Sequence, residues 1–124
     1  MGVLDGKAAI VTGSARGIGR ATAELLAEHG AKVLINDLDA DVAQQAASEI
    51  KGETTVFAGD LTKEGVPDQL VKKAVDEFGR LDIIVNNAAI GRSPDLATLT
   101  EQDFDEIFAV NVRAPFFIVQ QGLA

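Results

Sequence analysis

The stretch Lys7–Arg20 constrains the fold more than any other part of the chain. It reads K-A-A-I-V-T-G-S-A-R-G-I-G-R. Residues 8–11 form an apolar run without a polar break, which predicts a strand buried on both faces of a parallel sheet. Gly13, Gly17 and Gly19 follow, and good helix formers continue from residue 21 to residue 27. The stretch therefore predicts a buried strand, a glycine-rich turn and a helix.

Glycines at the junction of a buried strand and a helix have a physical use. The first N–H groups of a helix lack partners within the helix and carry partial positive charge, so a helix start attracts a phosphate. Glycine lets the backbone turn tightly and lets an anion approach without meeting a Cβ atom. The turn is therefore predicted to bind the pyrophosphate of a dinucleotide, although a purely structural turn would use the same residues.

Strand and helix patterns alternate through the rest of the chain. Apolar runs predict strands at 32–36, 54–58 and 81–86. Periodic apolar positions predict helices at 17–29, at 40–50, from a cap at Thr62 to residue 78, and at about 101–122, where Thr100 and Asp103 form a capping box. This alternation is typical of an α/β fold with a parallel sheet and helices on both faces. We expect the 124 residues to form a single domain, 1–124.

Composition excludes several classes of protein. The formal net charge of −8 argues against a nucleic-acid partner, which requires a basic face. The chain has no cysteine and one histidine, so we expect no metal site and no disulfide. It has no apolar run long enough for a membrane span and no signal-peptide pattern at its start. The cytoplasm is the expected location.

Asp37 follows the second predicted strand and lies eighteen positions after Gly19. A dinucleotide-binding fold places an acid at about this point, where it accepts hydrogen bonds from the ribose hydroxyls of NAD. A carboxylate there would repel the 2′-phosphate of NADP, so Asp37 favours NAD(H). Two alternatives remain open. Asp37 could be an acid at a helix start, like Asp39 and Asp41, and Arg16 in the glycine turn is the one basic residue that favours NADP.

Five motifs, taken in order, resemble the short-chain dehydrogenase/reductase family. They are the T-G-x-x-x-G-x-G turn at 12–19, Asp37, the pair Asp60-Leu61, N-N-A-A at 86–89 and Val110-Asn111. The resemblance spans the chain but covers only the first half of a family member. It implies a truncated Rossmann-type (βα)4 half-domain with strand order 3-2-1-4.

The resemblance also implies roles for individual residues. Asp60 and Leu61 would flank the adenine, and the backbone of 86–89 would follow the second ribose, with Ala89 standing where the family has glycine. The implied cofactor-binding set is Gly13, Arg16, Gly17, Ile18, Gly19, Asp37, Leu38, Asp60, Leu61, Asn87, Ala88, Ala89, Ile90 and Val110. Asn111 matches the family's catalytic asparagine, whose backbone carbonyl holds a water. Pro115 has no N–H to donate to that carbonyl, so we expect an interrupted and kinked helix, with or without a chemical role.

Two apolar surfaces predict self-association. In strand order 3-2-1-4 the fourth strand lies at an edge, which leaves the apolar segment 83–85 exposed and its backbone groups unpaired. The last helix carries two apolar lines, Phe104, Phe108, Val112 and Val119 on one and Ile107, Val110, Phe117 and Ile118 on the other. We therefore expect a homo-oligomer, at least a dimer, that pairs two fourth strands antiparallel and packs two final helices together.

The residues that the family uses for proton transfer are absent from the sequence. A full family member continues with a catalytic serine and a Tyr-x-x-x-Lys helix, and this chain contains no tyrosine. The first functional hypothesis is a diaphorase-like oxidoreductase that passes a hydride from NADH to a quinone, flavin or dye. The alternatives are a non-catalytic NAD-binding module, or the first half of a carbonyl reductase or alcohol dehydrogenase whose remainder is elsewhere.

Overall fold

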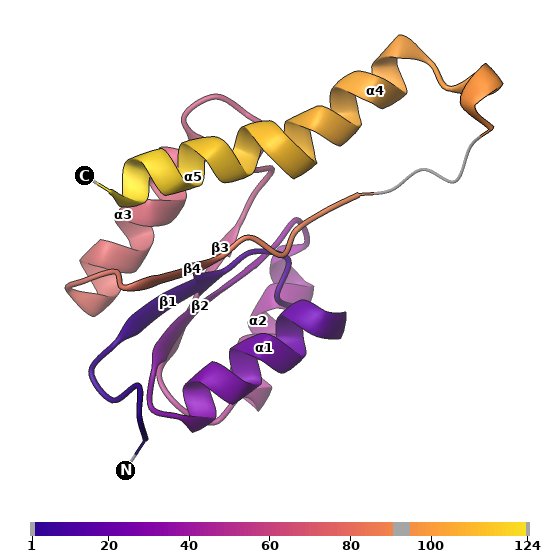
Figure 1. Ribbon diagram of the computed structural model, residues 1–124. Helices are drawn as coiled ribbons and strands as arrows, with labels where there is room; N and C mark the ends of the chain where they lie inside the picture. Colours follow the sequence, from indigo (N-terminus) through magenta and orange to yellow (C-terminus); the bar gives the residue numbers. More distant parts are fainter. Residues whose placement is uncertain (1, 91–94, 124) are drawn as a thin grey trace.

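Four strands form one parallel sheet in the order β3-β2-β1-β4. The computed structural model describes residues 2–90 and 95–123. Its strands are β1 (Ala8–Val11), β2 (Lys32–Asp37), β3 (Thr54–Ala58) and β4 (Ile83–Val85). Every residue of β1 is fully buried because β2 and β4 flank it and helices cover both faces (Figure 1). The predicted α/β class and strand order are confirmed.

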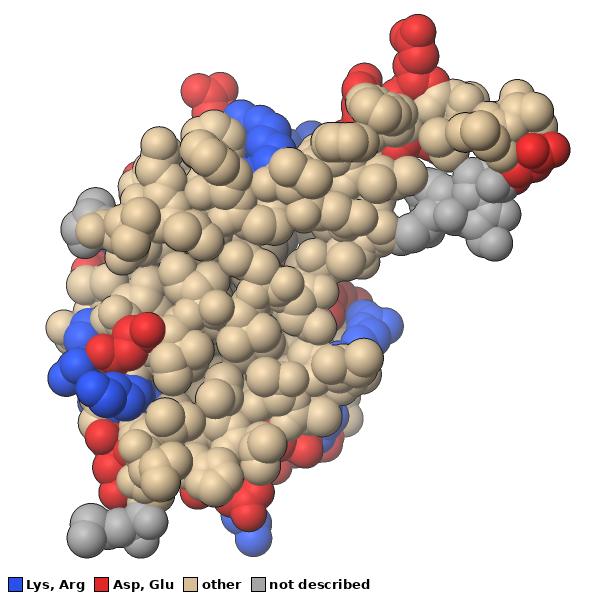
Figure 2. Space-filling model, viewed as in Figure 1, with Lys and Arg blue, Asp and Glu red and all other residues tan. Residues whose placement is uncertain are grey.

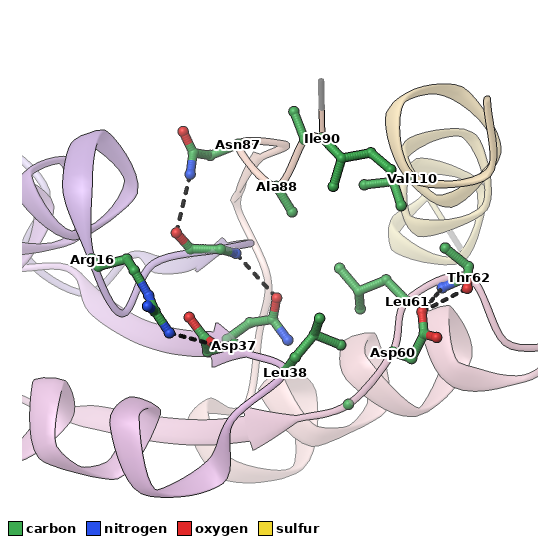
Figure 3. Close-up of a pocket in the computed structure, with 14 residues that line it drawn as sticks. Arg16, Asp37, Leu38, Asp60, Leu61, Thr62, Asn87, Ala88, Ile90 and Val110 are labelled. Atoms are coloured by element: carbon green, nitrogen blue, oxygen red, sulfur yellow. Dashed lines mark hydrogen bonds and ion pairs between the residues drawn. The ribbon is translucent and has the colours of Figure 1, made fainter. Parts of the chain in front are cut away.

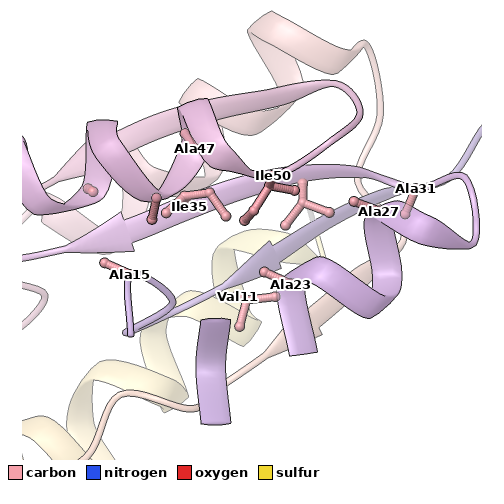
Figure 4. Close-up of a cluster of buried hydrophobic side chains, with 11 residues drawn as sticks. Val11, Ala15, Ala23, Ala27, Ala31, Ile35, Ala47 and Ile50 are labelled. Carbon is pink, nitrogen blue, oxygen red and sulfur yellow. The ribbon is translucent and has the colours of Figure 1, made fainter. Parts of the chain in front are cut away.

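Helices cover the two faces of the sheet in pairs. Helices α1 (Gly17–Glu28) and α2 (Ala40–Glu49) pack on one face, and α3 (Val66–Phe78) and α5 (Ala114–Gly122) pack on the other. Neighbouring strand residues serve opposite faces: Val11 joins the cluster under α1 and α2, whereas Ile10 joins the cluster under α3 and α5. The residues that α1 and α2 contribute to the first of these clusters are alanines (Figure 4). Because their side chains are small, both helices lie close to the sheet.

Two predicted element boundaries were wrong. Thr62 does not cap a helix: α3 begins after Gly65, and the Thr62 side chain donates to Asp60 instead. The fourth strand is shorter than predicted, because only Ile83–Val85 pair with β1. Asp82, just before β4, instead accepts the N–H of Ala8 through its carboxylate. The predicted capping box of Thr100 and Asp103 is confirmed.

The predicted final helix consists of three segments. Helix α4 (Glu101–Phe108) leads into a π-helical segment (Ala109–Arg113), which leads into α5. The expected interruption before Pro115 therefore takes the form of a π-helical insertion, in which the N–H of Ala114 donates to the carbonyl of Ala109. A 3-10 turn at Leu96–Thr98 precedes α4, and residues 91–94 lie outside the described residues.

Helix α4 extends past the edge of the sheet and has no buried residue. Acidic side chains lie on this projecting end of the molecule (Figure 2). The two apolar lines of the sequence separate in space: Ile118 is buried against the sheet, whereas Phe104, Phe108, Val112 and Val119 are exposed. In the described part of the chain, no helix has both the length and the apolar character that a membrane crossing requires.

Candidate functional site

A pocket of about 290 Å³ opens at the carboxyl ends of the four strands. In parallel sheets this edge is where ligands bind, at the point where the strand order reverses. Here β2 and β3 extend the sheet from one side of β1 and β4 pairs with its other side, so the order reverses at β1. The lining residues come from the segments after all four strands and from the π-helical segment: Gly13, Arg16, Asn36, Asp37, Leu38, Gly59, Asp60, Leu61, Thr62, Asn87, Ala88, Ala89, Ile90 and Val110.

The fold brings most of the predicted cofactor-binding residues into this one pocket. Three of them, Gly17, Ile18 and Gly19, do not line it and lie in the first turn of α1. Asn111 does not line it either, although its neighbour Val110 does. The pocket also includes three residues that sequence reasoning missed, Asn36, Gly59 and Thr62.

The glycine turn packs tightly against the segment that follows β4. Gly13 has a φ of +60°, and a Cβ atom on it would lie 3.1 Å from the Cα atom of Ala88. A Cβ atom on Gly19 would collide with the side-chain amide of Asn87 and with the carbonyl of Gly13. Glycine is therefore required at both positions by this packing, which leaves the start of α1 close to the strand ends.

Two asparagine side chains hold the backbone of Gly13 from opposite sides. The Gly13 N–H donates to Oδ1 of Asn36, near the end of β2, at 3.1 Å. The Gly13 carbonyl accepts from Nδ2 of Asn87, after β4, also at 3.1 Å (Figure 3). Asn36 is 2% exposed and its Nδ2 donates to the carbonyl of Phe57 in β3. The turn is thus fixed to both neighbouring strands of β1.

Thr12 fixes the segment after β4. Its buried Oγ1 accepts the N–H groups of Asn87 and Ala88 at 3.0 and 2.9 Å. Ala89 follows in the place where the resembled family has glycine. No described residue other than glycine has a positive φ, so alanine at position 89 causes no backbone strain.

The first turn of α1 suits an anion. No side chain caps this helix, and no acidic residue lies in its first turn. The helix start therefore keeps its partial positive charge facing the carboxyl edge of the sheet. This is the predicted place for a pyrophosphate.

Asp37 and Arg16 face each other at one side of the pocket. A nitrogen of the Arg16 guanidinium lies 3.7 Å from Oδ1 of Asp37, and this oxygen also accepts the N–H of Asp39 at 3.0 Å. The Asp37 side chain is largely buried, whereas the Arg16 side chain is 68% exposed. Because Arg16 is solvated and the distance is long, the pair holds Asp37 only weakly. Both residues can therefore contact a ligand in the pocket.

Asp60 lies across the pocket from Asp37 and remains ionised. The Thr62 hydroxyl and backbone N–H donate to its Oδ1 at 2.6 and 2.9 Å. These hydrogen bonds, first that of the hydroxyl and then that of the backbone, lower the pKa of the Asp60 carboxyl below its usual value of 3.8. The bond from the Thr62 N–H is ordinary turn chemistry, and it leaves a fixed carboxylate at the pocket wall.

Apolar side chains complete the pocket. Leu38 and Leu61 lie on one side of the opening and Ile90 and Val110 on the other. Leu38 is 74% exposed. A flat apolar group bound between these side chains would cover them.

Asn111 is tied to the segment after β4. Its Oδ1 accepts the N–H of Ile90 at 2.9 Å and its Nδ2 donates to the carbonyl of Ile90 at 2.8 Å. Pro115 has no N–H, so the Asn111 carbonyl lacks the donor that an α-helix would give it. The structure therefore assigns the Asn111 side chain to backbone support, and the predicted role of its carbonyl stays a prediction.

Of the missed pocket residues, Asn36 is buried and polar, and two residues of the glycine turn, Thr12 and Ser14, share this character. Asn36, Thr12 and Ser14 are all at most 2% exposed and all are hydrogen-bonded. The available signal was position: Thr12 and Ser14 come just after β1, and Asn36 lies near the end of β2, where a buried polar side chain needs a partner. Their partners lie on neighbouring strands, which the sequence alone does not identify.

Comparison with known proteins identifies relatives along nearly the whole chain. A family model described as short chain dehydrogenase matches residues 7–124. The chain is 41% identical over 117 residues to a sorbitol dehydrogenase from Cereibacter sphaeroides, a match that covers 94% of this chain and 46% of that protein. The chain therefore spans about half the length of this curated relative.

Solved structures have the same fold. A short chain dehydrogenase from Mycobacterium avium matches with a TM-score of 0.92 and 36% identity, over 98% of this chain and 47% of that one. A metagenomic short-chain oxidoreductase in complex with NADP matches with a TM-score of 0.89 and 33% identity, over 95% of this chain and 55% of that one. The similarity thus covers the sheet, its helices and the segments that line the pocket.

Proposed function

The chain belongs to the short-chain dehydrogenase family, and on this premise we propose that it binds NAD(H) across the carboxyl ends of β1–β4. One observation carries the proposal. The glycine turn, held by Asn36 and Asn87, aims the uncapped start of α1 at a pocket with Asp37 at its side. The residues present fit the cofactor, because an anion-binding helix start, a diol-binding carboxylate and apolar walls occur together.

Each part of the cofactor has a suitable place in this proposal. The pyrophosphate binds the first turn of α1, at Gly17, Ile18 and Gly19. The ribose hydroxyls donate to Asp37, and the adenine lies between Leu38 and Leu61 beside Asp60. The segment 87–90 lies along the second ribose, where Thr12 holds its backbone.

We propose a preference for NAD(H) over NADP(H), because a 2′-phosphate would meet the Asp37 carboxylate. Arg16 is the opposing group, since its exposed guanidinium could turn from Asp37 to a phosphate. The relative bound to NADP shows that the family also accommodates that cofactor. The preference therefore depends on whether repulsion of the 2′-phosphate by Asp37 is stronger than its attraction by Arg16.

The experiment measures the binding of NADH and NADPH to the chain by fluorescence titration. We expect saturable NADH binding and weaker NADPH binding. Asp37→Asn should weaken NADH roughly tenfold or more, the loss of a hydrogen bond to a charged group, and should strengthen NADPH. Asp41→Asn is the matched control, because Asp41 is exposed in the first turn of α2 and does not line the pocket. Equal effects of the two variants would contradict the ribose role of Asp37.

For this chain by itself we further propose diaphorase-like hydride transfer. When bound, NADH supplies a hydride, and a quinone, flavin or dye accepts it and takes its proton from solvent. The observation that favours such acceptors is the absence of tyrosine from the 124 residues, so the proton donor typical of the family is not in this chain. The protein's own part is to bind and orient the nicotinamide beside Ile90 and Val110.

Steady-state oxidation of NADH with dye, quinone and carbonyl acceptors separates three hypotheses. Faster reduction of dye or quinone, with no reaction of carbonyls, supports the diaphorase. Saturable NADH binding without turnover supports a non-catalytic NAD-binding module. Carbonyl reduction that appears only when a chain with the Tyr-x-x-x-Lys segment is added supports half of a reductase or alcohol dehydrogenase.

We also propose a homo-oligomer formed by the edge of β4 and the final helix. Residues Ile83–Val85 form one edge of the sheet and are only partly buried. Phe104 and Phe108 stack on each other at 4.5 Å between ring centres and are both about half exposed. Such a surface is stabilised by covering it with a second copy. A monomer in sedimentation velocity at micromolar concentration would contradict this.

A further inference from the structure

We infer that Asn36 is the positioning residue of the phosphate turn, an inference that rests on the proposed NAD(H) binding. Asn36 does not follow from the glycine pattern, since it lies at the end of β2. It is 2% exposed, yet both ends of its side-chain amide are hydrogen-bonded. A buried amide with both ends used specifies one arrangement of the groups that it joins.

Asn36 extends the hydrogen bonding between the first two strands beyond the end of β1. The regular pairing of β1 with β2 ends at Val11 and Ile35. Beyond it, the Ser14 N–H donates to the Asn36 carbonyl at 2.8 Å, and the Asn36 N–H donates to the Ser14 hydroxyl at 2.9 Å. The Asn36 side chain then accepts the Gly13 N–H. Asn36 therefore holds two successive N–H groups of the turn.

This arrangement decides which N–H groups face a phosphate. The amides of Gly13 and Ser14 both point to Asn36, so neither is available to an anion in the pocket. The donors that remain for a pyrophosphate begin further along the turn, at the uncapped start of α1. Asn36 thus directs the phosphate to the helix start.

Asn36 also connects the phosphate turn to the opposite wall of the pocket. Its Nδ2 donates to the carbonyl of Phe57 at 3.0 Å. Phe57 lies in β3, and the segment after β3 contributes Gly59, Asp60 and Leu61 to the pocket. One side chain therefore sets the spacing between the pyrophosphate site and the adenine site, so its loss should weaken dinucleotide binding.

The first test follows amide hydrogen exchange by NMR in the ligand-free chain. In Asn36→Ala the Gly13 N–H loses its acceptor and should exchange at least ~10-fold faster, a loss of about one hydrogen bond. The Ser14 N–H should stay protected, because its acceptor is the backbone carbonyl of residue 36. Equal loss of protection at both amides would mean that the turn has unfolded, and would overturn a specific role of the side chain.

The second test uses Asn36→Asp and the affinity for NAD+ by calorimetry at pH 8.5 and pH 5.5. The ionised carboxylate cannot donate to Phe57 and adds negative charge near the pyrophosphate, so binding at pH 8.5 should weaken ~10-fold or more. The site of residue 36 is 2% exposed, and burial disfavours the charged form and raises the pKa of a carboxyl placed there. The protonated acid is then populated at pH 5.5 and restores both a donor and an acceptor, so binding should recover there. Gln44→Glu, an exposed change on α2 with the same charge, should bind like the wild type at both pH values.

The outcomes separate this inference from the proposed function. If the wild-type chain does not bind NAD+, the proposed function fails and the positioning role fails with it. If the wild type binds NAD+ and Asn36→Ala binds it equally well, with the Gly13 amide exposed to exchange, only the positioning role of Asn36 is overturned. Weakened binding in Asn36→Ala together with recovery of Asn36→Asp at pH 5.5 supports it.

Discussion

The side-chain amide of Asn111 forms two hydrogen bonds with the backbone of Ile90, at 2.9 and 2.8 Å, across 21 positions of sequence. This pair joins the π-helical segment to the segment that follows β4. Its consequence is local: Val110 and Ile90 are held next to each other in the pocket wall. The site therefore depends on a residue that does not itself line the pocket.

Asn111→Asp should destabilise the chain by about 1–2 kcal/mol, because an ionised carboxylate keeps the acceptor for the Ile90 N–H but repels the Ile90 carbonyl. Urea unfolding measures this change. Gln69→Glu, an exposed substitution of the same type on α3, is the control and should change the free energy of unfolding by less than ~0.5 kcal/mol. Equal stability of the two variants would contradict the structural role of the Asn111 side chain.

Gly19→Ala should disrupt the turn more specifically than Gly17→Ala. A Cβ atom on Gly19 meets the Asn87 amide, which must move at a cost of about 1–3 kcal/mol. Gly17 has open space around it, but its φ of +63° makes alanine cost about 1–2 kcal/mol. The distinguishing measurement is the NMR signal of the Asn87 side-chain amide, which should shift strongly only in Gly19→Ala.

The Asp82 carboxyl should make the stability of the fold depend on pH in the acidic range. The Arg80 guanidinium and, second, the Ala8 N–H hold the pKa of the Asp82 carboxyl at about 2, against a usual value of 3.8. Because the pKa is lower in the folded chain, this group stabilises the fold above about pH 4, and the contribution is lost as the pH falls towards 2. Thermal unfolding should show Asp82→Asn below the wild type in Tm at pH 6, with the difference shrinking towards pH 2.

A control for this pH dependence is Asp76→Asn on α3. Asp76 pairs with Lys72 on an exposed helix surface and holds no backbone group of another strand. Its Tm should stay close to that of the wild type throughout the same pH range. If Asp82→Asn behaves in the same way, Asp82 does not join the starts of β1 and β4 in solution.

Phe116→Glu should weaken self-association. Phe116 is 61% exposed on α5, in line with the other exposed apolar residues of the final helix. A carboxylate there would lose its hydration in a helix-to-helix interface, so sedimentation velocity should show more monomer. Leu25→Glu is the matched control, since Leu25 is 54% exposed on α1, on the other face of the sheet. Equal dissociation by both variants would argue against the final helix as the interface.

The parts of the fold that depend on short sequence patterns could be predicted. The buried strand at Ala8–Val11 follows from its apolar run, and the capping box of Thr100 and Asp103 from two residues three apart. The cap predicted at Thr62 was wrong: Asp60 accepts both the N–H and the hydroxyl of Thr62 in a turn, and α3 begins only after Gly65. A turn stabilised by the Asp60 side chain thus forms where the sequence also allowed a helix cap.

The polar connections of the site could not be predicted from the sequence. Asn36 reaches Gly13 and Phe57, and Asn111 reaches Ile90, across 21 to 23 positions in each case. Such partners depend on which strands are neighbours and on where each strand ends. The glycine pattern predicts that a turn forms, whereas its exact position comes from side chains on β2 and after β4.

The most direct test of the central claim is a titration of the isotopically labelled chain with NAD+ followed by NMR. NAD(H) binding at the carboxyl edge predicts saturable shifts in the first turn of α1 and at 37–38, 60–61 and 87–90, with α4 unaffected. Absence of saturable shifts, or shifts that are largest away from these segments, would contradict it.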